Sequence, residues 1–152
     1  MTSTGRTEQT AAKDPAKTTE RLRGASMGAL VMLIIQFALG SAVSLYITPH
    51  KGGVGEAFSS GPLLALHSVL GVLLVLAAIG VLVQSIMARY RFMIVVSAIG
   101  LIAILGAASN GISFLSNHQA GASLGMALAT AVAMLCYAVA LRVPGSPERA
   151  GA

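Results

Sequence analysis

The sequence predicts an all-α fold, an integral membrane up-and-down four-helix bundle. Of the 152 residues, 55% are hydrophobic and only 10% are charged, a balance that is not typical of a water-soluble domain of this length. Four apolar runs are each long enough to cross a hydrocarbon core of roughly 30 Å, which takes about 20 helical residues. Two of the connections between these runs are very short, which fixes the direction of the neighbouring helices. The expected solvent is therefore a bilayer.

The four spans are expected at residues 25–47, 62–88, 92–116 and 120–143. Charged residues are absent from the interiors of these runs. Because a backbone in hydrocarbon must satisfy its own hydrogen bonds, and because the runs lack the alternation of barrel strands, they are interpreted as helices. The connections at residues 89–91 and 117–119 are too short for anything but antiparallel neighbours.

This interpretation divides the chain into three parts. Residues 1–24 are rich in Thr, Ala and charge, so they have little to bury and are expected to form a disordered cytoplasmic tail. Residues 25–143 form the transmembrane domain. Residues 144–152 contain two prolines and no apolar run, and are expected to form a second cytoplasmic tail.

The basic residues are distributed in a way that indicates membrane topology. They precede the first span, join the second to the third, or follow the fourth: Arg6, Lys13, Lys17, Arg21, Arg23, Arg89, Arg91, Arg142 and Arg149. Lys51 is the only basic residue in the other two loops. By the positive-inside rule, the chain is a multi-pass protein of the cytoplasmic membrane with both termini in the cytoplasm. Contact with lipid headgroups then explains the net charge of +5 without a nucleic acid partner.

The first span also resembles a signal peptide, because it follows a basic stretch and contains the small residues "LGSAVS". Its apolar run is longer than the roughly 7 to 15 residues of a signal sequence. Cleavage would also leave three spans. The first span is therefore expected to remain in the protein.

Small residues predict which helix faces pack, because close backbone approach drives helix association in lipid. In the fourth span they recur every four residues, at Gly121, Gly125, Ala129 and Ala133, and in the first span at Gly24, Gly28, Gln36, Gly40 and Ser44. One face of the second span carries His67, Gly71 and Ala78. One face of the third span carries Ala103, Ala107, Asn110 and Gly111. The few polar groups are thus expected to face protein. The same rows are also compatible with a homodimer.

His67 is the ionisable residue within the second span, close to its outer end. Such residues are costly in a membrane and usually face an interior, a partner or a cofactor. His118, at the outer start of the fourth span, lies on the same predicted side. His67 and His118 are therefore candidate axial ligands of a haem b, with Gly71, Gly121 and Gly125 leaving room for the ring. In the competing interpretation His67 only forms a hydrogen bond with Gln36 or Asn110 across the bundle.

Two segments carry a resemblance to a known family. "LIIQFALGSAVSLYITP", followed by a loop and "LLALHSVLGVLLVLAAI", resembles one four-helix half of the haem A synthase family. The resemblance implies that His67 is a haem ligand and that His118 matches a second one. This chain has only one such half, lacks Trp, and has "GPLL" where the family places a carboxylate before the histidine. The resemblance therefore implies a scaffold that holds haem, and not oxidation of a porphyrin methyl group.

The sequence thus predicts a haem b protein that serves electron transfer or haem handling, in contact with a respiratory or haem-handling membrane complex. The alternative is a cofactor-free scaffold or accessory subunit of a larger complex. No catalytic residue is predicted, since the serines near His67 have no third group to orient a base.

Overall fold

The computed structural model describes residues 15–46, 61–117 and 120–142. Within these ranges the secondary structure is entirely helical, as expected, and contains α1 (Pro15–Tyr46), α3 (Pro62–Met87), α4 (Arg91–Asn117) and α5 (Ala120–Ala140). Each of the four is long and apolar enough to cross a membrane. The helices of the second, third and fourth spans begin and end within a few residues of the predicted limits.

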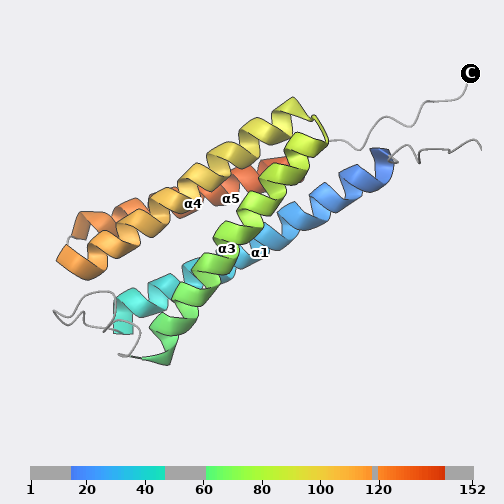
Figure 1. Cartoon of the computed structure of the whole chain (residues 1–152). Coiled ribbons are helices and arrows are strands. Elements are labelled where there is room, and N and C mark those ends of the chain that lie inside the picture. Colours follow the sequence, from blue (N-terminus) through green and yellow to red (C-terminus); the bar gives the residue numbers. More distant parts are fainter. Residues whose placement is uncertain (1–14, 47–60, 118–119, 143–152) are drawn as a thin grey trace, which may run out of the picture.

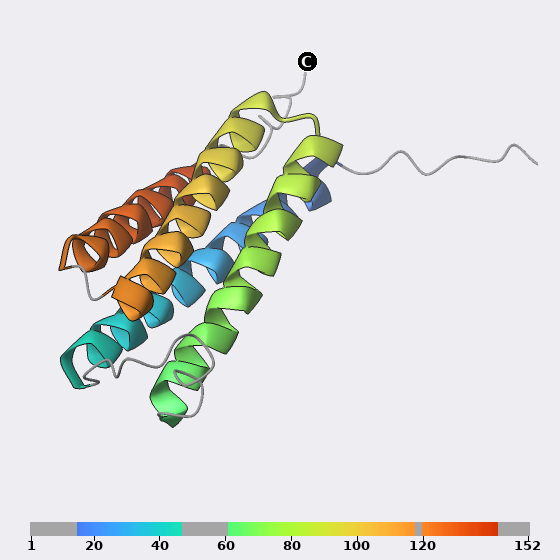
Figure 2. The same ribbon diagram turned by 60° about the vertical axis from the view of Figure 1, so that its left-hand side comes forward.

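The four described helices form a bundle in which successive helices run in opposite directions (Figure 1). α1 contacts α3 and α5, and α4 contacts the same two helices, with the most extensive contact between α4 and α5. The start of α1 and the end of α5 lie near the short α3–α4 connection, as both views show (Figure 2). The up-and-down order expected from the short connections is therefore present.

The start of α1 corrects the predicted tail. The helix begins at Pro15 rather than at residue 25, so residues 15–24 belong to it. Pro suits the first helical position, where its missing N–H has no intrahelical acceptor to lose. Leu22 then packs in a buried cluster with Met93 and Ala140, which explains why the helix continues with the bundle. The rest of the predicted N-terminal tail and residues 144–152 lie outside the described residues.

The core lies along the centre of the bundle and uses small side chains where helices come close. Ala78 on α3 and Ala133 on α5 are completely buried in one cluster with Leu33, Leu74 and Tyr137. Alanine at such points allows neighbouring helices to approach closely. The outward faces are apolar as well, with Val72, Ile102 and Leu135 among the exposed side chains, and a bilayer is the solvent that suits them.

The predicted rows of small residues pack only in part. On α1, Gly40 is buried against α3, whereas Gly24 and Gly28 are exposed and have no atom of another helix near their missing side chains. On α5, Ala133 is buried and Gly121 is exposed. Since a helix turns through about 100° per residue, a four-residue spacing drifts by about 40° at each step. A row of several such steps therefore leaves the packed face.

Candidate functional site

His67 lies in the second turn of α3, and its half-buried side chain faces α1. A Cβ atom added to Gly40 of α1 would lie 3.0 Å from Cε1 of the imidazole and 3.7 Å from each ring nitrogen. The ring therefore occupies the space that any other residue at position 40 would fill with its own side chain. This makes Gly40 a site residue, which sequence reasoning placed only in a packing row.

Gln36, one turn before Gly40 on α1, is the residue that reaches His67. Its Nε2 atom donates a hydrogen bond to the backbone carbonyl of His67 over 2.8 Å, and lies 3.4 Å from Nε2 of the imidazole. The missing side chain of Gly71 makes room for this amide, since a Cβ atom there would lie 3.0 Å from Nε2 of Gln36. Each helix thus provides a glycine that accommodates the polar side chain of the other. We call these four residues the His67–Gln36 interlock.

Both polar side chains of this interlock retain unused hydrogen-bonding capacity. Within the described residues, Nδ1 of His67 and Oε1 of Gln36 are buried and have no hydrogen-bond partner. The 3.4 Å contact between the amide and Nε2 of the ring is longer than a strong N–H hydrogen bond. Because burying a polar group without a partner is unfavourable, a further hydrogen bond or ligand at either atom would be stabilising.

Asn110, the other polar residue considered for His67, is held elsewhere. Its Nδ2 atom donates to the carbonyl of Gly106 over 2.8 Å within α4. A Cβ atom added to Gly125 of α5 would lie only 2.7 Å from Oδ1 of Asn110. Asn110 and Gly125 therefore form a second glycine contact, between α4 and α5, and Gln36 is the residue that contacts His67.

The three glycines predicted to leave room for a porphyrin differ in their surroundings. The space beside Gly71 is taken by Gln36, and the space beside Gly125 is taken by Asn110. Gly121 is exposed and has no atom of another helix within 4 Å of its missing side chain. In the described part of the chain, these positions do not outline a slot beside His67.

The donor set fits a haem in one respect. His67 supplies an imidazole that lacks a strong hydrogen bond to either ring nitrogen, and imidazole is a common axial ligand of haem iron. The second predicted ligand, His118, lies outside the described residues. No group of three or more His, Cys, Asp or Glu side chains that would suit a metal ion on its own occurs among the described residues.

Two buried hydroxyl groups at other depths were not singled out by sequence reasoning. Ser26 on α1 and Tyr137 on α5 are buried, and their oxygen atoms have no hydrogen-bond partner within the described residues. The Tyr137 ring packs against Gly100 of α4, where a Cβ atom would lie 3.1 Å from Cε2. A tyrosine near the end of an apolar run was the available signal.

Comparison of the chain with protein family models, with curated proteins and with solved structures yields no match.

Proposed function

We propose that this chain is a small membrane protein that binds haem b, with His67 as one axial ligand and His118 as the other. The observation that carries the proposal is the buried Nδ1 atom of His67, which has no hydrogen-bond partner among the described residues. Keeping an ionisable side chain within a membrane span costs free energy, and binding a metal is one of the few roles that offset this cost.

A bound haem supplies one-electron chemistry, and the protein supplies its placement and surroundings. Gln36 would fix the position of His67 through its 2.8 Å hydrogen bond to the His67 carbonyl. That bond involves the backbone, so it leaves the ring nitrogens free of a strong interaction. The resulting role is electron transfer or haem handling beside a respiratory or haem-handling membrane complex.

The absorption spectrum of the protein tests this proposal. Protein purified in mild detergent, after expression with added haem precursor, is expected to show a Soret band that shifts on reduction with dithionite. His67→Ala should lose the band, and His118→Ala should lose or shift it. Asn110→Ala is the matched control, because it removes a polar side chain from a span without touching His67, and it should keep the band. A colourless wild-type protein contradicts the proposal.

A cofactor-free scaffold or accessory subunit is the second candidate, and a specific observation favours it. The spaces beside Gly40 and Gly71 are already filled by His67 and Gln36, as expected if the polar side chains serve helix packing alone. This candidate predicts a colourless protein in which His67→Ala lowers the free energy of unfolding and changes no spectrum.

We also propose that the chain lies in the cytoplasmic membrane with both termini inside. The support is the set of basic residues at the end of the bundle where α1 begins and α5 ends. Single cysteines in a Cys136→Ser background test this orientation. With a membrane-impermeant maleimide, Lys51→Cys should react in intact cells and Arg89→Cys only after lysis. The reverse pattern would contradict the proposed orientation.

A further inference from the structure

The charged residues of the described part of the chain gather at one end of the bundle. This end carries six basic residues and one acidic residue: Lys17, Arg21, Arg23, Arg89, Arg91, Arg142 and Glu20. The opposite end, where α1 and α4 finish and α3 and α5 begin, has no Asp, Glu, Lys or Arg within the described residues. The first end is therefore strongly electropositive.

A small buried cluster packs the segments that carry these arginines against one another. Leu22 of α1, Met93 of α4 and Ala140 of α5 pack together, with Ala88 beside them. Each of these residues lies within two positions of an exposed arginine in the chain: Arg21, Arg23, Arg89, Arg91 and Arg142. We call these five the arginine ring. Packing of the cluster thus brings cations from separate helices to the same end.

Arg89 occupies a backbone position that favours glycine. At the end of α3, the N–H groups of Arg89 and Tyr90 donate to the carbonyls of Ile86 and Ser85, over 3.0 and 3.4 Å. This is the Schellman arrangement that ends many helices, and Arg89 takes its left-handed position with a φ of 55°. Glycine adopts this conformation without steric cost, whereas arginine does not. Arginine at this position therefore adds a positive charge, although glycine would suit the backbone conformation better.

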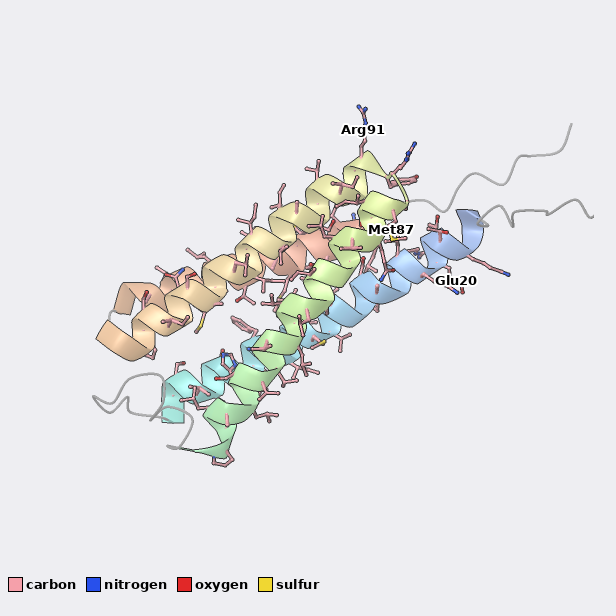
Figure 3. All side chains as sticks on the ribbon, in the orientation of Figure 1. Glu20, Met87 and Arg91 are labelled. Atoms are coloured by element: carbon pink, nitrogen blue, oxygen red, sulfur yellow. The ribbon has the colours of Figure 1, made fainter. Side chains whose placement is uncertain are left out.

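Apolar side chains border the arginine ring on the bundle surface. Met87, two residues before Arg89, is 66% exposed, and Phe92, directly after Arg91, is 50% exposed. Met87 and Arg91 lie at the same end of the bundle (Figure 3). The first turn of α4, which begins at Arg91, adds the partial positive charge of its free N–H groups. A ligand that suits this surface has an anionic phosphate and long apolar chains.

We propose that the arginine ring binds the headgroup of an anionic phospholipid, with the acyl chains lying along Met87 and Phe92. The exposed apolar border distinguishes such a lipid from a soluble phosphate, which has no part that would cover it. The inference does not depend on haem, because His67 faces α1 near the uncharged end of the bundle.

The chain contains no Trp, so a single introduced one reports on nearby lipid. Phe92→Trp would be reconstituted in vesicles of equal parts phosphatidylglycerol and phosphatidylcholine, with brominated acyl chains on only one of the two lipids. Stronger quenching by the brominated phosphatidylglycerol is expected, equivalent to an enrichment of about fivefold for each arginine that contacts a headgroup. Leu66→Trp, at the uncharged end, should show no preference.

Charge variants in the Phe92→Trp background complete the test. Arg89→Gly removes one charge and keeps the left-handed turn, so a fall of about fivefold in the enrichment reports on charge and not on misfolding. Lys17→Gln removes one charge outside the arginine ring and should leave the enrichment in place. Equal quenching by both lipids, or an enrichment that Arg89→Gly leaves unchanged, would overturn the proposal. Displacement by inorganic phosphate, but not by sodium chloride of equal ionic strength, would instead assign the ring to a soluble anion and overturn it too.

Discussion

Gln36 on α1 donates a hydrogen bond from its Nε2 atom to the backbone carbonyl of His67 on α3, over 2.8 Å. The same amide lies where Gly71 has no side chain, and the imidazole lies where Gly40 has none. The contact between these helices therefore combines close backbone approach with a polar interaction. This relationship allows the contributions of glycine and of hydrogen bonding to be measured separately.

Replacing Gln36 by Ala is expected to weaken the contact between α1 and α3. Hydrogen bonds between membrane helices contribute about 0.6 kcal/mol on average and up to about 1.7 kcal/mol, and the lost packing against Gly71 adds to this. The free energy of unfolding should therefore fall by about 1 to 2 kcal/mol, measured by titration with sodium dodecyl sulfate in mixed micelles. Gln84→Ala, at an exposed position of α3, is the control. An unchanged value for Gln36→Ala would show that the amide contributes no stability.

Replacing Gly40 by Ala is expected to displace the imidazole. The new methyl group would lie 3.0 Å from Cε1 of His67, and overpacking of this kind costs about 1 to 3 kcal/mol. Gly28→Ala on the same helix is the matched control, since nothing lies within 4 Å of its missing side chain; it should leave stability unchanged or raise it by up to about 1 kcal/mol. In a His67→Ala background, Gly40→Ala should cost much less than it does in the wild type, because the ring that it would displace is gone. Equal effects of Gly28→Ala and Gly40→Ala would contradict the position of the ring.

The contact between Asn110 and Gly125 leads to a similar prediction for the helix pair α4 and α5. Gly125→Ala would place a methyl group 2.7 Å from Oδ1 of Asn110, closer than van der Waals contact allows, so a loss of about 1 to 3 kcal/mol is expected. Gly121→Ala, one turn earlier on α5 and free of neighbours, should lose nothing. The Asn110→Ala background should remove the penalty of Gly125→Ala. A penalty that persists there would mean that another group fills the space.

Tyr137→Phe is expected to preserve or increase stability. The hydroxyl oxygen of Tyr137 is buried and has no hydrogen-bond partner within the described residues, and an unsatisfied buried polar group costs about 1 to 3 kcal/mol. The ring contact with Gly100 is unchanged in this variant. Tyr90→Phe at an exposed position controls for the substitution itself. A loss above about 1 kcal/mol in Tyr137→Phe would reveal a partner for the hydroxyl group.

Sequence reasoning located the helices well because span length and apolar composition are local properties. It was wrong about the start of α1, since residues 15–24 carry charges that resemble those of a tail. Their helical state is associated with the burial of Leu22 against Met93 and Ala140, which are far away in the chain. Contacts of this kind leave no trace in the composition of the segment.

The candidate site was predictable only as a set of residue types. His67 stood out because an imidazole is rare in an apolar run, and Gln36 for a similar reason. That Gln36 rather than Asn110 contacts His67 depends on the rotation of each helix and on which helices are neighbours. The pairing of Gly40 with the ring depends on the same quantities. A four-residue spacing does not supply them, because it drifts around the helix.

The two glycine contacts also bear on the order of assembly during synthesis. One joins α1 to α3 and the other joins α4 to α5, so each links two helices that are consecutive among those the structure describes. The first hairpin is able to close before the second has been made, and the two then associate through the α3–α4 and α1–α5 surfaces. A chain divided at the α3–α4 connection would accordingly be expected to reassemble from two co-expressed fragments.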